Sequence, residues 1–164
     1  MGVTGTGKSL VGAAVAEDLG LVFVEGDALH PRVNIEKMSV GIPLTDADRL
    51  PWLDKIGAEI IASLSASEGI VISSSALKKI YRDRLRSFAE GRLSFIFLRG
   101  SEDVLAPRIA ARKGHFMPLS LLQSQLATLE DPSGEDGVIT VDISGTAEEV
   151  IAEAIRKVRA RISA

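Results

Sequence analysis

Residues 2–9 read Gly2-Val3-Thr4-Gly5-Thr6-Gly7-Lys8-Ser9 and fit the pattern G-x-x-x-x-G-K-[ST]. Glycines in such a loop allow positive φ angles, so that successive N–H groups and the start of the following helix can point at one anion. In this pattern the lysine reaches the β- and γ-phosphates of a nucleotide, and the hydroxyl of the last residue ligates Mg²⁺. We therefore expect all eight residues to bind ATP, Lys8 to act on the transferred phosphate and Ser9 to hold the metal.

A loop of this kind normally follows a β-strand that lies in the middle of the sheet. Here only Met1 precedes Gly2. Without a central strand, two neighbouring strands would have unpaired backbone groups, at a cost above the roughly 5 to 15 kcal/mol by which a domain is stable. We therefore expect the true start to lie upstream, and an added apolar run of about five residues to raise solubility and thermal stability.

Beyond this loop, short apolar segments alternate with longer segments of helical periodicity. The short segments, 21–24, 70–72, 93–98 and 138–141, are rich in β-branched or aromatic residues and are bounded by Gly, Ser or Asp. Continuous apolar strands that alternate with helices are typical of a parallel sheet buried on both faces. The sequence therefore predicts a three-layer α/β fold, in which a parallel sheet is flanked by helices.

Capping residues help to place the helix ends. Ser101 and Thr146 precede acidic first turns and are expected N-caps, and Gly20 stands where a helix should end. Pro107 lies inside a helical pattern over 102–112, so we expect a kink or a later helix start there.

Composition limits the class of protein. The length of 164 residues fits one domain spanning 1–164, and a net charge of −3 provides no basic field for nucleic acid. There is no cysteine for disulfides, and the apolar runs are too short for a membrane span. With no signal sequence at the start, we expect a cytoplasmic protein without nucleic-acid or membrane partners.

Two acids follow the first apolar segment. Ligands bind at the carboxyl ends of strands in open α/β sheets, and Glu25 and Asp27 occupy such a position. Asp27 can accept the proton of a substrate hydroxyl as it attacks the γ-phosphate, and Glu25 can reach the metal directly or through water. Helix capping and loop solvation are the alternative for either acid.

Three further segments carry a specific resemblance. GDALHP at 26–31, within a run that extends to Leu53, SALKKIYRD at 75–83 and ARKGHF at 111–116 resemble the gluconokinase family of P-loop kinases. The resemblance covers nearly the whole chain. It implies ATP-dependent phosphorylation of D-gluconate at the 6-hydroxyl, giving 6-phospho-D-gluconate and ADP, in a fold similar to those of shikimate and nucleoside monophosphate kinases. It also implies a homodimer.

A gluconate site needs cations for the carboxylate and hydrogen-bonding groups for the hydroxyls. The candidate cations are Arg49, Lys78, Lys79 and Arg82, of which Lys78 and Arg82 lie four residues apart on one expected helix face. His30 can bond a hydroxyl or brace its loop. Trp52, the single tryptophan, fits a core position better than a ligand platform.

The segment around Arg108 and Arg112 resembles the lid and its preceding helix in small kinases. We expect a lid near 112–119, with Gly114 as its hinge, in which Arg112 stabilises the transferred phosphate while Arg108 contacts the nucleotide. A solvated helix end is the alternative for these cations. Residues 141–145 are similar to an adenine-side loop.

The chain departs from the family pattern at two places. Glu25 stands where many relatives have Asp, and the segment 70–72 is followed by Ser73-Ser74-Ser75 without an acid. Mg²⁺ would then depend on Ser9, phosphate oxygens, waters and the acids at 25 and 27. Two other functions stay open: a kinase acting on another small acid or on a nucleoside monophosphate, and a nucleotide-binding module without transfer activity.

Overall fold

The computed structural model describes residues 1–111 and 119–163. Short strands alternate with helices along the chain. In order, the elements are α1 (Lys8–Leu19), β1 (Val22–Val24), the 3-10 helix η1 (Gly26–Leu29), α2 (Arg32–Ser39), α3 (Asp46–Ser65), β2 (Ile70–Ile72), α4 (Lys79–Ser87), β3 (Phe95–Arg99), α5 (Glu102–Ala110), α6 (Leu119–Thr128), β4 (Val138–Asp142) and α7 (Ala147–Ile162).

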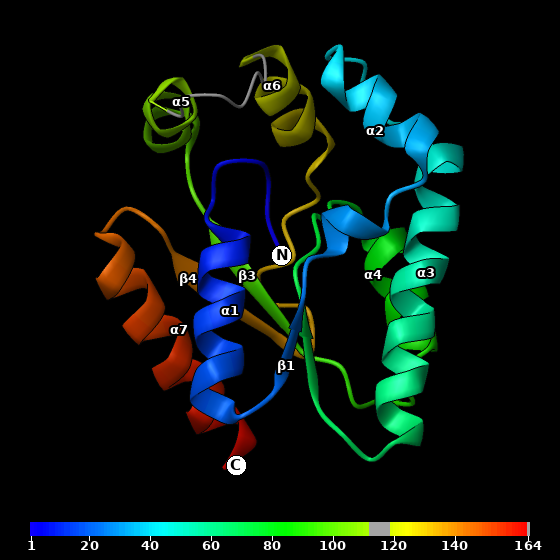
Figure 1. Ribbon diagram of the computed structural model, residues 1–164. Helices are drawn as coiled ribbons and strands as arrows, with labels where there is room; N and C mark the ends of the chain where they lie inside the picture. The colour runs from blue at the N-terminus through cyan, green and yellow to red at the C-terminus, as the bar shows by residue number, and fades with distance from the viewer. Residues whose placement is uncertain (112–118, 164) are drawn as a thin grey trace.

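Helices cover both faces of the strands, which confirms the predicted three layers (Figure 1). On one side α1 packs against α7, and on the other α3 packs against α4. Two apolar clusters fill the space between the layers. One includes Val11, Val15, Leu98, Leu105, Val141 and Ala154, and the other includes Trp52, Leu53, Ile56, Tyr81, Leu85 and Phe97.

The strands pair in parallel, as the sequence predicts, but they form two pairs rather than one continuous sheet. β1 pairs with β2 from Val22 opposite Ile70 to Val24 opposite Ile72. β3 pairs with β4 from Phe95 opposite Val138 to Arg99 opposite Asp142. No ladder joins β2 to β3 in the described part of the chain.

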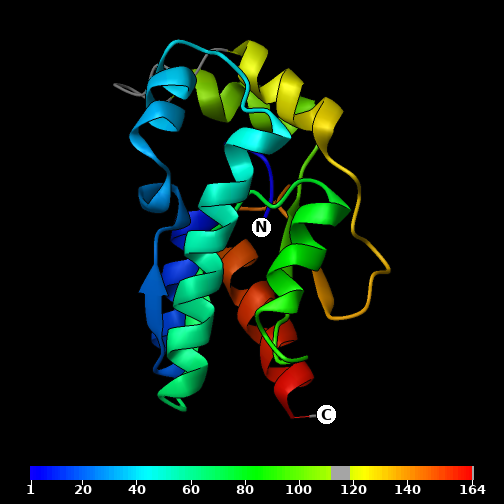
Figure 2. The ribbon, with the colours of Figure 1, turned by 90° about the vertical axis from the view of Figure 1, so that its right-hand side faces the viewer.

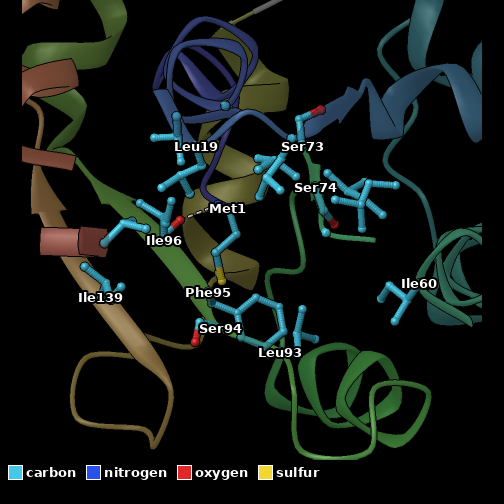
Figure 3. Close-up of a pocket in the computed structure, with 18 of the residues that line it drawn as sticks. Met1, Leu19, Ile60, Ser73, Ser74, Leu93, Ser94, Phe95, Ile96 and Ile139 are labelled. Atoms are coloured by element: carbon cyan, nitrogen blue, oxygen red, sulfur yellow. Dashed lines mark hydrogen bonds between the residues drawn. The ribbon is translucent and has the colours of Figure 1, made fainter. Parts of the chain in front are cut away.

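An apolar slot of about 360 Å³ separates β2 from β3. Met1 lies in this slot, between Ser73 and Ser74 at the end of β2 and Phe95 and Ile96 of β3 (Figure 3). The Met1 carbonyl oxygen accepts a hydrogen bond from Leu98 N over 2.9 Å, and the Met1 amino group donates to the carbonyl of Ile96. Met1 is thus paired with β3 in the manner of a single strand residue.

The carboxyl ends of the strands face a common edge of the molecule. β1 leads into η1 and β3 leads towards α5 at this edge, and the loop formed by residues 2–7 lies beneath α5 and α6 (Figure 1). Figure 2 shows α5 and α6 crossing the same end from a second side. This edge therefore brings together the residues expected to bind ligands.

Most predicted boundaries are confirmed within a few residues. Thr146 caps α7 through a reciprocal pair of bonds with Glu149, and Gly20 ends α1 in a left-handed conformation. Ser101 precedes α5 as expected, although its side chain makes no capping bond there. The later start expected from Pro107 is wrong, because α5 begins at Glu102 and includes the proline. Among the helices that the structure describes, none is long and apolar enough to cross a bilayer.

Candidate active site

The glycine-rich loop folds into a compact turn that leads directly into α1. Gly5 and Gly7 take positive φ angles of 82° and 86°, which only glycine adopts without strain. The Thr6 hydroxyl and the Lys8 ammonium both donate to the Val3 carbonyl, over 2.9 and 3.0 Å. No side chain caps the start of α1 within the described residues. The first-turn N–H groups are thus directed at the space inside the loop, where an anion would be favoured.

Two helices beyond the loop hold it in place. A β-carbon on Gly5 would lie 3.0 Å from the Ile109 side chain, which shows how closely α5 approaches the loop. From α6, the Gln125 side-chain oxygen accepts a hydrogen bond from Thr4 N over 2.7 Å. The conformation of the loop is therefore coupled to α5 and α6.

Arg108 of α5 contacts the loop that follows β4. Its guanidinium donates to the carbonyls of Ile143 and Gly145 over 2.7 and 3.1 Å. The sequence assigned both Arg108 and residues 141–145 to the nucleotide side, and the structure brings them into contact. Nucleotide contact by Arg108 itself stays a prediction.

A small pocket of about 50 Å³ joins the loop to the edge of the β1–β2 pair. Several of the predicted site residues line it, together with residues for which the sequence predicted no role. The lining residues are Thr4, Lys8, Asp27, His30, Met38, Leu44, Arg49, Ser75, Leu121 and Gln125. The expected lysine, carboxylate and one expected cation therefore meet in one place.

Asp27 lies in η1 and lines this pocket. Loss of water around its carboxyl raises the pKa of Asp27, and the charge of Glu25 adds to the rise, while Lys8 and Arg49 oppose it. A carboxylate with a raised pKa holds a proton more readily than an exposed one, which suits a group that must take a proton from a hydroxyl.

The residue before Asp27 is held from two sides. Gly26 N donates to the Ser73 hydroxyl over 3.0 Å, and the Trp52 indole donates to the Gly26 carbonyl over 2.7 Å. A β-carbon at Gly26 would lie 1.8 Å from the Ser73 carbonyl oxygen, so only glycine fits. The N–H and the carbonyl of Gly26 are thus both held by side chains, the first by Ser73 after β2 and the second by Trp52 of α3.

His30 is stacked on Trp52, with ring centroids 4.3 Å apart and planes 12° from parallel. Asn34 Nδ2 donates to the Asp48 carbonyl over 2.7 Å and lies 3.3 Å from His30 Nδ1. Because this amide nitrogen is a donor, Nδ1 of His30 accepts and the ring proton belongs on Nε2. Burial, followed by the charges of Arg49 and Lys55, lowers the pKa of His30 to about 4. His30 is therefore a neutral imidazole at physiological pH.

Arg49, in the first turn of α3, supplies a second cation beside Lys8 to the pocket. The residue is only 7% exposed, and its Nε has no hydrogen-bond partner among the described residues. Its guanidinium carbon lies 5.6 Å from the centroid of the Tyr81 ring. Burial lowers the pKa of Arg49, and nearby Tyr81 and Asp46 oppose the shift. Because a buried guanidinium is stabilised by a paired anion, Arg49 is the candidate in this pocket for binding a carboxylate.

Lys78 and Arg82 do not line the pocket and do not share a helix face as expected. Lys78 precedes α4 and pairs with Asp46 at 2.7 Å. Arg82 is fully buried, and its guanidinium bonds Glu135 and the carbonyls of Ala76 and Leu77. The geometry gives Arg82 a structural role, because its donors are occupied by the protein itself.

The predicted metal residues lie at the same edge but are not gathered into a cluster. Ser9 is exposed in the first turn of α1, and the Glu25 carboxylate accepts a hydrogen bond from Ser73. The described residues contain no group of three or more His, Cys, Asp or Glu that could hold a metal by themselves. Any metal here would therefore need ligands from the nucleotide.

Some predictions concern residues outside the described part of the chain, and some residues of the pocket were not predicted. The predictions for Arg112, for Gly114 and for a lid near 112–119 concern a stretch whose residues 112–118 lie outside the described part of the chain. Sequence reasoning assigned no role to Ser75 or Gln125, and it did not foresee the two bonds that hold Gly26. The only signals for that last feature are the glycine directly before Asp27 and the single tryptophan.

Comparisons with known proteins agree with this geometry. A protein-family model described as "AAA domain" matches residues 1–132. The gluconokinase of Gluconobacter oxydans (strain 621H) is 48% identical over 160 residues, covering 98% of this chain and 89% of the relative. The thermoresistant gluconokinase of Escherichia coli (strain K12) is 45% identical over 160 residues, covering 97% and 91%. A crystal structure of a gluconokinase from Sinorhizobium meliloti 1021 superimposes with a TM-score of 0.90 at 56% identity, covering 99% of this chain and 90% of the other.

A glycine-rich phosphate loop, a parallel α/β core and a carboxylate facing the lysine define a P-loop kinase. The identities above extend over nearly the whole chain. The protein belongs to the gluconokinase family.

Proposed function

We propose that this protein transfers the γ-phosphoryl group of ATP to the 6-hydroxyl of D-gluconate, giving 6-phospho-D-gluconate and ADP. The observation that carries this proposal is that Lys8, Asp27 and Arg49 line one pocket. A phosphate-binding lysine, a carboxylate with a raised pKa and a buried arginine correspond to the three needs of the reaction. The gluconokinase relatives support the choice of acceptor.

In this mechanism the substrate hydroxyl oxygen forms a bond to the γ-phosphorus. The bond from that phosphorus to the β,γ-bridging oxygen breaks, and Asp27 takes the hydroxyl proton. Lys8 and the loop N–H groups neutralise the charge on the phosphates. Arg49 binds the gluconate carboxylate, and Nε2–H of His30 donates to an acceptor oxygen.

Magnesium fits the donor set as a nucleotide-bound ion. Mg²⁺ keeps several waters and prefers phosphate oxygens, so one hydroxyl from Ser9 can complete its shell. Glu25, whose carboxylate is engaged by Ser73, would reach the ion through water. Ser9, and Glu25 through water, would hold the ion, whose charge would offset that of the phosphates.

The assay that tests this proposal measures ADP release with ATP, Mg²⁺ and a panel of acceptors. We expect release with gluconate, and not with shikimate or nucleoside monophosphates. Replacement of Asp27 by Asn should lower kcat at least about a hundredfold while ATP still binds, because the proton acceptor is lost. Asp54→Asn is the matched control, since Asp54 pairs with Arg84 on an exposed surface. A normal kcat for Asp27→Asn would remove this residue from the role of base.

Four finer points belong to the proposal. A homodimer and a role for Arg112 at the transferred phosphate rest on the family resemblance, whereas a single domain over 1–164 rests on chain length and a cytoplasmic location on the sequence pattern at the start. Light scattering of the purified protein tests the first of these. A monomer at assay concentrations would contradict it.

A further inference from the structure

One side chain contacts both acceptor-side groups of the pocket. The Trp52 indole N–H donates to the carbonyl of Gly26, the residue joined to Asp27, over 2.7 Å. The face of the same indole stacks on His30 at 4.3 Å. Trp52 itself is fully buried and does not line the pocket.

The bond to Gly26 acts on the backbone that carries Asp27. Gly26 N is held from the other side by the Ser73 hydroxyl, so the peptide groups on both sides of this residue have fixed directions. Because Asp27 follows at once, the direction of its Cα–Cβ bond is set by these two contacts. A loss of either contact would let the carboxylate move relative to the phosphate loop.

The stack acts on His30. Asn34 fixes one edge of the imidazole through Nδ1, and Trp52 fixes its plane. Together they leave Nε2–H as the donor of the ring and restrict the orientation of the ring. The neutral state of this ring is maintained by its burial.

We propose that Trp52 is a positioning residue that sets the geometry of the acceptor side of the pocket, fixing Asp27 through its N–H and His30 through its ring face. This proposal rests on the function proposed above. The two contacts have different effects. The N–H, through Asp27, affects kcat, and the ring face, through His30, affects the binding of the acceptor.

Two substitutions separate these effects. Trp52→Phe keeps an aromatic ring against His30 but removes the N–H, so kcat should fall about tenfold while the KM values for ATP and gluconate change less than about twofold. Trp52→Leu removes both contacts, so we expect the same loss of kcat together with a KM for gluconate raised about tenfold. The KM for ATP should stay unchanged in both variants, because the two contacts of Trp52 described above are with Gly26 and His30 rather than with the phosphate loop.

Ile56→Val is the control, since Ile56 lies one turn further along α3, is 1% exposed and does not line the pocket. It should reduce stability without changing kcat or KM. Ser73→Ala keeps the tryptophan and removes the opposite hold on Gly26 together with the bond to Glu25, so kcat should fall at least as far as in Trp52→Phe. A Trp52→Phe enzyme with wild-type kcat, or a Trp52→Leu enzyme with wild-type KM for gluconate, would overturn the proposal.

A second readout does not depend on turnover. Trp52 is the single tryptophan, so a ¹H–¹⁵N spectrum contains one indole N–H signal, downfield of the backbone amides, and all indole emission comes from this site. We expect the N–H to exchange slowly with solvent, and gluconate to change the emission in a saturable manner. Fast exchange or an unchanged emission would contradict the positioning role. If the wild type releases no ADP with gluconate, the proposed function fails; if it does and the variants match it, only the role of Trp52 fails.

Discussion

The side-chain oxygen of Gln125 accepts a hydrogen bond from the backbone N–H of Thr4 over 2.7 Å. Gln125 belongs to α6 and Thr4 to the phosphate-binding loop, so the two segments are tied together across 121 residues of sequence. An N–H group of this loop is among those that would point at a nucleotide phosphate. A phosphate that takes this N–H as a donor must therefore displace the carboxamide.

We predict that Gln125→Ala binds a non-hydrolysable ATP analogue about three- to tenfold more tightly than the wild type, because one neutral hydrogen bond no longer competes with the phosphate. Calorimetry measures the dissociation constant. Gln123→Ala is the matched control, since Gln123 lies on the same helix and bonds Glu102 on an exposed surface. Weaker binding by Gln125→Ala would show instead that this side chain helps to hold the nucleotide.

Arg82→Lys should reduce the free energy of unfolding by about 2 to 3 kcal/mol, because a lysine cannot reproduce the bonds to Glu135 and to two buried carbonyls. Urea unfolding measures this change, with Arg84→Lys, at an exposed pair with Asp54, as the control. The KM for gluconate should stay within about twofold of the wild type, since Arg82 does not line the pocket. A raised KM without loss of stability would return Arg82 to the substrate site.

The slot between β2 and β3 leads to a prediction about the first residue. An extension of about five apolar β-branched residues before Met1 should raise Tm by several degrees, because it can pair with β3 beyond Met1 and fill the slot. An equally long Gly-Ser extension is the control. Equal melting temperatures for the two extended proteins would argue against strand pairing in the slot.

In the chain that begins at Met1, the buried amino group of this residue makes the free energy of unfolding depend on pH. Burial, with a smaller effect of Lys8, lowers the pKa of the Met1 amino group from 8.0 to about 5. Between these values the unfolded chain binds the proton and the folded chain does not, so this group makes stability rise as the pH rises from about 5 to 8. Acetylation of the amino group should abolish this part of the pH dependence, which urea unfolding at several pH values measures.

The sequence was sufficient for those features that depend on neighbouring residues. The phosphate loop, the parallel pairing of the strands and the cap at Thr146 all follow from local pattern, and the structure confirms them. Arg82 shows where this reasoning fails. Charge spacing alone places Arg82 beside Lys78, whereas its burial depends on Glu135, which lies 53 residues away. The role of Gln125 was equally hidden, because an uncharged side chain on a helix carries no signal until its partner is known.

The candidate site shows a similar division. Asp27, His30 and Arg49 were predicted from residue type and position, and they line the pocket together with Lys8. The two bonds that hold Gly26 were not predicted, because they come from Ser73 and Trp52, on segments far from Gly26 in the sequence. Residue type predicts which groups react, while the contacts that orient them become visible only in three dimensions.

Hydrogen bonds of Met1 to β3 connect the phosphate loop to the β3–β4 pair. Asp27, in contrast, follows β1, which belongs to the β1–β2 pair. The phosphate loop and Asp27 are therefore attached to two separate strand pairs. Helix α1 connects the two pairs, because it packs on β1, β2 and α7. The distance between the phosphate loop and Asp27 therefore depends on how the β1–β2 pair is packed against the β3–β4 pair. Substitutions that tighten or loosen the packing of α1, far from the pocket, should therefore change kcat while all reacting groups stay the same.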